Sequence, residues 1–433
     1  MRHERISVTD EAAELNQQLK GTVAERLLSR QGVRAYYPKS GIPGQTMEAK
    51  GTQINATLGQ AFDDERQPLY IPAFAKYTNL DPKEVFPYAP THGITPLREF
   101  WQKEIRRKNP SLDGIISLPV ATSGLAHGLT LAQQLFIDEY DMVTIFAPFW
   151  GNYKLHFEGE NEQTIWNPVP LYNQKEKLNL TEILAALSGM DRKHILSLTF
   201  PSNPTGYTPT EAEAEDLFTI IKESAERNND ILVICDDAYF GLTYEKGLLE
   251  ESPFARLANI HENVLAVKVD GATKEAFFWG ARVGFLTYGF KGMTKEEAKA
   301  LEDKTAGRVR GTISGVCTGS QHMVLHGMQD PLFEEQLQKN RDILQGRVQT
   351  IKRTLEEHPE WREEYRALPF NSGYFMCLKT NKDTERVRKI LRMEYNTGVL
   401  SINNMLRIAH AAVPEHAIPE LYENIYQACK KVS

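Results

Sequence analysis

The sequence has few cysteines and no long apolar run. Its cysteines are four in number, scattered along the chain, and form no CxxC pair. Four scattered cysteines in a chain of this length suggest neither a disulfide framework nor a zinc site, and no other metal site is indicated. No window approaches the roughly 18 apolar residues that span a bilayer. The first 18 residues are charged throughout and lack the apolar stretch of a signal peptide. We therefore expect a cytoplasmic protein with no membrane partner.

An excess of basic charge is also missing. The 433 residues include 50 Lys and Arg against 57 Asp and Glu, a formal net charge of −7. A protein that binds the nucleic-acid backbone needs a dense basic face, so we expect no nucleic-acid partner. The length indicates two domains, or one large and one small.

Short apolar runs alternate with helical patterns through the middle of the chain. The runs occupy 142–146, 194–200, 231–237, 263–270 and 282–289, and helical patterns cover 94–107, 124–138 and 211–227. This alternation predicts an α/β fold in which helices cover both faces of a mainly parallel sheet.

The pattern changes at both ends of the chain. Residues 9–30 predict one amphipathic helix. After about residue 330, a long helix over 333–358 precedes short strands at 374–380, 398–402 and 406–411, with helices near 383–392 and from about 415. We therefore expect a large domain over 51–330, and a small α+β domain formed by 1–50 and 331–433.

Polar residues follow three of the predicted strands. Asn203 lies in SNPTG after the second run, Asp236 and Tyr239 lie in DDAYFG at the end of the third, and Lys274 and Arg282 follow the fourth. Ligands of open α/β sheets bind at the carboxyl ends of the strands. We therefore expect these residues to form a site.

Lys274 and Asp236 offer an amine that can form a Schiff base and a poorly solvated carboxylate. Desolvation and the nearby Arg282 would lower the pKa of Lys274 and prepare its amine for Schiff-base formation, although most lysines lie on surfaces. A carboxylate at the end of an apolar strand needs a partner, such as a pyridinium nitrogen or a salt bridge. Spacing alone does not choose between Asp236 and Asp237.

Three further positions offer groups for a ligand. Ser123, Gly124 and Leu125 open a helical pattern, where backbone N–H groups can bind a phosphate. Trp150 follows the first strand and is either a stacking aromatic or part of the core. Arg407 lies in an apolar strand, where it needs a planar anion: a substrate carboxylate or a neighbouring Asp or Glu.

Nine segments in chain order, from about residue 50 to 410, resemble the class I/II aminotransferases, which are fold-type-I pyridoxal-phosphate enzymes. The segments are INATLG, YAPTHG, TSGLAHG, PFWGNY, SNPTG, DDAYFG, TKEAFFWGARVG, NSGYF and LRIAH. The resemblance implies a seven-stranded-type sheet, pyridoxal 5'-phosphate as cofactor, and amino-group transfer between an amino acid and a 2-oxo acid by a ping-pong mechanism.

The resemblance also implies a role for each matching residue. Lys274 looks like the lysine that binds the cofactor covalently and then moves the proton. Asp236 rather than Asp237 looks like the partner of the pyridinium nitrogen, and Arg407 like the arginine that binds the substrate carboxylate. The cofactor phosphate is expected to be bound by Arg282, Ser123, Gly124 and Leu125, and the cofactor ring by Trp150, Asn203 and Tyr239. Tyr88 is expected to reach the phosphate bound to a neighbouring subunit, which implies a homodimer. Gly59 and Asn203 are expected to contact the substrate.

Two departures and two alternatives accompany the resemblance. Gly271 stands where many relatives have Ser or Thr at the phosphate, and Thr273 could substitute for it. Neither Arg308 nor Arg310 aligns clearly with the arginine that can bind a substrate side chain. A lyase or decarboxylase would use the same lysine, aspartate and arginine. Aminotransferase-like transcription regulators carry an added N-terminal DNA-binding domain, which we do not find in the roughly 50 residues before the match.

Overall fold

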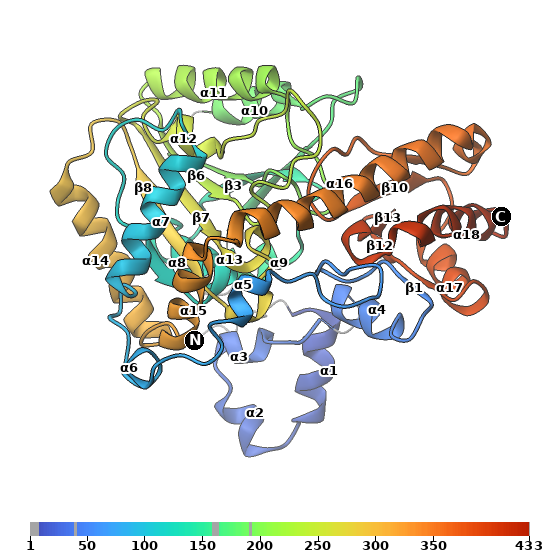
Figure 1. Cartoon of the computed structure of the whole chain (residues 1–433), viewed down its shortest axis with the longest axis horizontal. Coiled ribbons are helices and arrows are strands. Elements are labelled where there is room, and N and C mark those ends of the chain that lie inside the picture. Colours follow the sequence, from blue (N-terminus) through green and yellow to red (C-terminus); the bar gives the residue numbers. More distant parts are fainter. Residues whose placement is uncertain (1–7, 39–40, 158–163, 190–192, 433) are drawn as a thin grey trace.

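A seven-stranded sheet forms the centre of the larger lobe in the computed structural model, which describes residues 8–38, 41–157, 164–189 and 193–432 (Figure 1). The strand order is β2-β8-β7-β6-β5-β3-β4. Strand β8 is antiparallel to both neighbours, and the other adjacent pairs are parallel. The predicted mainly parallel sheet is confirmed. Its strands are β2 (Val120–Thr122), β3 (Met142–Ala147), β4 (Ile165–Pro170), β5 (Lys193–Leu198), β6 (Asp230–Asp236), β7 (Val264–Gly271) and β8 (Gly284–Gly289).

Helices cover both faces of this sheet. One face packs against α10 (Leu180–Leu187), α11 (Glu211–Glu226) and α12 (Pro253–Leu257), and the other against α8 (Gly124–Phe136), α9 (Asn152–Phe157) and α14 (Lys295–Thr312) (Figure 1). Because both faces are covered, β6 is buried over nearly its whole length. This explains why its sequence reads as a continuous apolar run.

Further helices and turns lie beside the sheet on the side of β2 and β8. They include α5 (Pro72–Ala75), α6 (Pro82–Val85), α7 (Thr95–Lys108), α13 (Ala272–Glu275), the 3-10 turn η1 (Trp279–Ala281) and α15 (Thr318–Gln329). Helix α15 contacts α5, α6, α7 and η1, and therefore connects the segment around residue 88 with the segment after Lys274.

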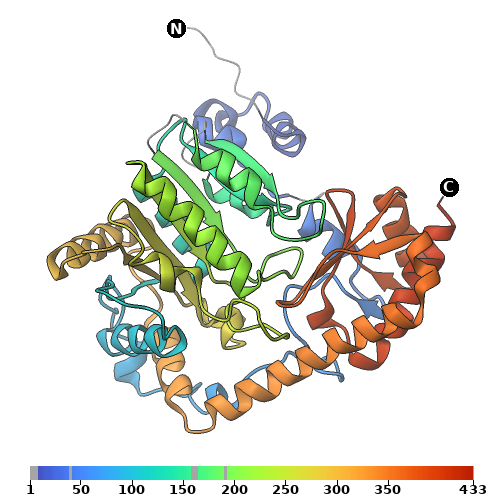
Figure 2. The same cartoon turned by 90° about the horizontal axis from the view of Figure 1, so that it is seen from above.

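The smaller lobe contains an antiparallel sheet of order β12-β13-β10-β9. Helix α16 (Phe333–Glu357), 25 residues long, leads from the larger lobe to this sheet (Figure 2). The elements are β9 (Tyr365–Ala367), β10 (Met376–Thr380), β12 (Leu400–Ile402), β13 (Met405–Ile408), α17 (Thr384–Glu394), α18 (Ile418–Lys430), and the 3-10 turns η2 (Pro359–Glu363), η3 (His410–Ala412) and η4 (Glu415–Ala417).

The prediction of one helix over 9–30 is wrong. The structure has α1 (Asp10–Gln18), α2 (Val23–Leu27) and α3 (Arg30–Arg34). Gly21 has a φ of +80°, which is incompatible with continuing α1, and the Thr22 side chain caps the new helix. Ser29 caps α3 in the same way.

The chain before residue 56 contacts both lobes. Helix α4 (Ile42–Glu48) joins the smaller sheet through paired hydrogen bonds between Gln45 and the backbone of Ser401, and β1 (Ile54–Asn55) pairs in parallel with β11 (Thr397–Gly398). Helices α1 to α3 lie beside the larger lobe (Figure 2). The division into 51–330 and the two end segments stays a prediction.

No helix in the described ranges is both long and apolar enough to cross a membrane.

Candidate active site

The carboxyl ends of β2, β3, β5, β6 and β7 lie at one edge of the sheet, because these strands run in the same direction. The predicted site residues follow these ends: Ser123 after β2, Trp150 after β3, Asn203 after β5, Asp236 at the end of β6, and Lys274 just after β7. The parallel topology therefore brings together residues that are up to 151 positions apart.

Asp236 is buried and hydrogen-bonded on both carboxylate oxygens. The Tyr153 hydroxyl donates to Oδ2, and the backbone N–H of Ala238 donates to Oδ1 at 3.1 Å. Thr199 Oγ1 lies 2.6 Å from the same tyrosine hydroxyl. Burial raises the pKa of Asp236, while Tyr153 and Lys274 oppose the rise. The carboxylate is thus held rigidly in a position where a cation would be favourable.

Asp237 already has partners on the other side of β6. The buried amine of Lys268 and the hydroxyl of Ser252, at 2.6 Å, both bind Oδ2 of Asp237. The two adjacent aspartates therefore differ: the carboxylate of Asp237 belongs to a buried ion pair, and that of Asp236 lies toward Lys274.

Lys274 is partly buried, and its amine lies 4.7 Å from the centre of the Tyr239 ring. Burial lowers the pKa of Lys274 to about 8; Arg282 adds to this effect and Asp236 opposes it. This amine is therefore neutral far more often near pH 7 than an ordinary lysine amine, and a neutral amine is nucleophilic and basic.

Tyr239 lies at the centre of the cluster. Its hydroxyl is 3.5 Å from Nδ2 of Asn203, and its ring packs edge-on against Tyr374 and Phe375. Burial raises the pKa of Tyr239, so its hydroxyl stays protonated. Trp150 is half-buried and lies with its ring centre 5.7 Å from that of Tyr153.

The start of α8 lies against Arg282. A Cβ placed on Gly124, which has a φ of +76°, would be 2.5 Å from Nη2 of Arg282, so only glycine leaves room for the guanidinium. Arg282 is itself in the left-handed region, with a φ of +54°. Ser123 and Leu125 flank Gly124 at this helix N-terminus, where the free N–H groups favour an anion.

Gly271 has no room for a side chain. A Cβ there would lie 2.6 Å from the carbonyl oxygen of Val283 and 2.7 Å from Cα of Gly284, which excludes Ser or Thr in this backbone arrangement. Two residues later, the buried hydroxyl of Thr273 has no hydrogen-bond partner within the described residues. This supports the expectation that Thr273 takes the place of the side chain missing at Gly271.

Arg407 lies in β13 with its guanidinium 4.2 Å from the centre of the Phe375 ring. Its Nη2 donates to the carbonyl of Thr57 at 2.9 Å, and its Nε has no partner among the described residues. Burial lowers the pKa of Arg407 to about 10, so it remains charged at pH 7. No carboxylate of the described chain lies within 4.0 Å of it, which disfavours the internal salt bridge left open by the sequence.

Two predicted site residues, Tyr88 and Gly59, and the two arginines left open by the sequence, Arg308 and Arg310, lie apart from this cluster or at its margin. Tyr88 is fully exposed, and Gly59 is an exposed residue shortly after Thr57. Arg308, on α14, donates from Nε to Gln134 on α8 at 2.9 Å, and neither it nor Arg310 lines the pocket described next.

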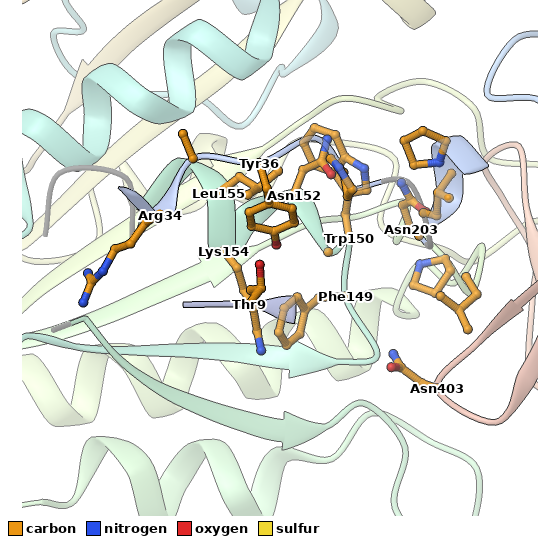
Figure 3. A pocket seen from close by; sticks show the side chains of 18 of the residues that line it. Thr9, Arg34, Tyr36, Phe149, Trp150, Asn152, Lys154, Leu155, Asn203 and Asn403 are labelled. Carbon is orange, nitrogen blue, oxygen red and sulfur yellow. The ribbon is translucent and has the colours of Figure 1, made fainter. Parts of the chain in front are cut away.

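A pocket of about 920 Å³ adjoins the cluster through Trp150 and Asn203 (Figure 3). Arg34 and Tyr36 of the N-terminal segment line it together with Phe149 and Lys154 of the larger lobe. Lys274 and Arg407 are not among its lining residues. The pocket therefore adjoins the cluster without including the Lys274 amine or Arg407.

Sequence reasoning missed Tyr153, Thr57 and Phe375. Each lies within a recognised segment, PFWGNY, INATLG or NSGYF, so a signal was present. Their partners were not readable, because the contacts between Tyr153 and Asp236 and between Thr57 and Arg407 span 83 and 350 positions.

Comparisons with known proteins identify the family of this chain. Residues 53–425 match the sequence model of the family "Aminotransferase class I and II". An aspartate aminotransferase of Bacillus sp. (strain YM-2) is 24% identical over 64% of each chain, and that of Bacillus subtilis is 24% identical over 63%. The matched part of this chain thus spans slightly less than two thirds of these relatives.

Solved structures show the same fold. An aminotransferase from Anaerococcus prevotii has a TM-score of 0.80 at 22% identity, covering 90% of this chain and 95% of that one. The Pyrococcus horikoshii kynurenine aminotransferase, solved with PMP, has a TM-score of 0.76 at 17% identity and covers 94% and 98%. The chain belongs to the class I and II aminotransferase family.

Proposed function

We propose that this protein is a cytoplasmic pyridoxal-phosphate-dependent aminotransferase that moves an amino group from an amino acid to a 2-oxo acid by a ping-pong mechanism. The observation that carries the proposal is the Lys274 amine, with a pKa of about 8, close to the rigidly held carboxylate of Asp236. Family membership and the names of the relatives support it.

The residues fit the cofactor at both of its ends. Gly124 leaves space beside Arg282, and the Thr273 hydroxyl is buried without a partner, so this end offers donors for a phosphate. At the other end, Asp236 offers a buried carboxylate to a protonated pyridine nitrogen. Ser123 and Leu125 would complete the phosphate contacts, and Trp150, Asn203 and Tyr239 those of the ring.

When bound, pyridoxal phosphate supplies an electron sink for the charge that develops at the substrate α-carbon. The protein side chains perform the remaining tasks. The neutral amine of Lys274 removes the α-proton and later returns it, since its lowered pKa suits proton transfer near neutral pH. Tyr153 orients Asp236 through its hydrogen bond, and the Asp236 carboxylate would favour the protonated form of the ring nitrogen.

Arg407 positions the substrate. Its unpaired Nε and its contact with Phe375 leave a charged, desolvated guanidinium available for the α-carboxylate, which it can bind in a bidentate manner. Holding the carboxylate orients the Cα–H bond toward Lys274, and such alignment accounts for much of the rate acceleration in enzymes. Gly59 and Asn203 would contact substrate beside it.

Tyr88 completes the site of a second subunit in this proposal. Its side chain is fully exposed and belongs to the YAPTHG segment. An exposed tyrosine is free to reach a neighbouring molecule, so each site would need two chains, and a two-fold homodimer is expected.

A spectroscopic titration tests the function. The full-length protein is reconstituted with pyridoxal phosphate, and its visible absorption is followed as single amino acids, beginning with aspartate, and then 2-oxoglutarate are added. We expect one amino acid to abolish the visible band and the oxo acid to restore it. Release of ammonia or carbon dioxide without need for an acceptor would instead establish a lyase or decarboxylase.

The variant Lys274→Ala tests the role of the lysine. We expect it to fold and to lose turnover by about 10²–10⁴-fold or more, the range typical of a missing acid–base group. Lys246→Ala, at an exposed position, should behave as wild type. Near-normal turnover by Lys274→Ala would refute the assignment.

A further inference from the structure

Two histidines and a glutamate form a cluster on the outer side of the larger lobe, separate from the candidate active site. His322 and His326 lie four residues apart on α15, and Glu84 lies on the adjacent α6 (helices labelled in Figure 1). One ligand atom from each lies within 4.8 Å of the others, and all three side chains are partly buried. The spacing i, i+4 places both imidazoles on one face of the helix.

The two distances from the imidazole nitrogens to Glu84 are close to those between ligands of one metal ion, and the two nitrogens lie within 4.8 Å of each other. Nδ1 of His322 and Nε2 of His326 lie 3.3 Å and 2.7 Å from the same oxygen, Oε1 of Glu84. Two ligands of a tetrahedral zinc ion, each about 2.1 Å from the metal, are about 3.4 Å apart. The His322 contact already has this length. The His326 contact would need to widen by about 0.7 Å, which a rotation of the partly exposed Glu84 side chain can supply.

The surroundings of Nδ1 of His322 add to this indication. This atom is buried and forms no hydrogen bond within the described residues, although Glu84 lies at 3.3 Å. A simple His326–Glu84 hydrogen bond would leave that nitrogen unsatisfied, and buried polar atoms without partners are uncommon. A metal ion between the three side chains would satisfy it.

We propose that Glu84, His322 and His326 bind a divalent transition-metal ion of the zinc type. Imidazole and carboxylate ligands in a set of three are suited to zinc, and water would complete the coordination because the cluster is partly exposed. Magnesium prefers an oxygen-rich octahedral site and should bind poorly. The sequence indicated no zinc site. The proposed site could not be found there, because Glu84 and His326 are 242 positions apart and come together only in the fold.

The ion would link α6 to α15 and so hold the segment that carries Tyr88. Other contacts already tie this segment to α15: Thr318 donates to the carbonyl of Pro87 at 2.8 Å, and the N–H of Ile94 donates to Gln321 at 2.9 Å. The metal would add a link at the start of the same segment. We therefore expect zinc to stabilise the region around Tyr88, whether or not the proposed transamination is correct.

Isothermal titration calorimetry with ZnCl₂ tests the site. The full-length protein, without an affinity tag and reconstituted with pyridoxal phosphate, is treated with a chelator, dialysed, and titrated. We expect one zinc ion per chain and no binding of MgCl₂ under the same conditions. The variants His322→Gln and His326→Gln should each weaken zinc binding by at least about tenfold, because each removes a ligand.

His358→Gln is the matched control. His358 also lies beside a glutamate, with Nδ1 3.0 Å from Glu360, but no third ligand group accompanies it in the described chain. Its zinc affinity should equal that of wild type. X-ray absorption at the zinc edge should show two imidazole ligands in wild type, which checks the site without any variant.

Zinc should also raise the thermal unfolding midpoint of wild type, and at the same zinc concentration it should raise that of His326→Gln by less. Zinc binding no tighter than magnesium binding, or wild-type zinc affinity in both histidine variants, would overturn the proposal. An absorption spectrum without imidazole ligands would do the same.

Discussion

The lowered pKa of Lys274 leads to a quantitative prediction about the cofactor-free protein. An ordinary lysine, with a pKa of 10.5, is neutral in only about 0.03% of molecules at pH 7. With a pKa of about 8, Lys274 is neutral in about 9%. Its neutral form is therefore about 300-fold more abundant at pH 7 than ordinary ionisation would allow.

Competitive acetylation measures this difference. The cofactor-free protein and added Nα-acetyl-lysine are labelled with trace acetic anhydride between pH 6 and 11, and mass spectrometry follows the peptide that contains Lys274. We expect half-maximal labelling of Lys274 near pH 8. A midpoint near 10.5 would refute the argument from burial.

Two charge variants test the physical cause of the shift. Asp236→Asn removes the carboxylate that favours the ammonium form, so the midpoint should move below 8. Arg282→Gln removes a repelling cation, so the midpoint should move above 8. Shifts of both variants in the same direction would contradict this electrostatic explanation.

Three further substitutions have clear expected outcomes. Gly124→Ala should weaken pyridoxal phosphate binding by about tenfold or more in an absorbance titration, because the new Cβ displaces Arg282 and strains a positive φ. Gly280→Ala is the control, because a Cβ at that position contacts no other atom, and it should bind the cofactor as wild type does. Equal affinities of the two variants would contradict the argument. Tyr153→Phe should lower kcat by about tenfold or more, because Asp236 loses a charge-assisted hydrogen bond, and an unchanged kcat would show that the bond is dispensable. Lys268→Met should reduce the free energy of unfolding by about 3–5 kcal/mol in urea titrations, because it leaves buried carboxylates unpaired; a loss below about 1 kcal/mol would be inconsistent with the ion pair.

Linear features of the sequence were enough to identify most of the fold and much of the candidate site. The continuous apolar runs in β5, β6 and β7 predicted buried parallel strands, and chemistry placed directly after them located Asn203 and Lys274. The predicted and observed bounds of these strands differ by one or two residues in most cases. The strand expected from residue 282 begins at 284, because Arg282 adopts a left-handed backbone conformation.

Local pattern failed where a break depends on a single backbone torsion. One amphipathic pattern covered 9–30, but the positive φ of Gly21 and two side-chain caps divide it into three helices. Likewise, 398–402 was expected as one strand, whereas its residues pair with two different sheets. Amphipathic periodicity does not report which partner a strand finds.

The sequence by itself determined which residue types follow each strand, since that order is local. The resemblance favoured Asp236 over Asp237, but only the tertiary structure gave the physical reason, because Lys268 pairs with Asp237 on the other side of β6. It also decided that Tyr153 holds Asp236 and that Glu84 meets His326, contacts that span 83 and 242 positions. The physical reason is that hydrogen bonds and ion pairs act over a few ångströms in space, and the fold alone brings distant positions within that range.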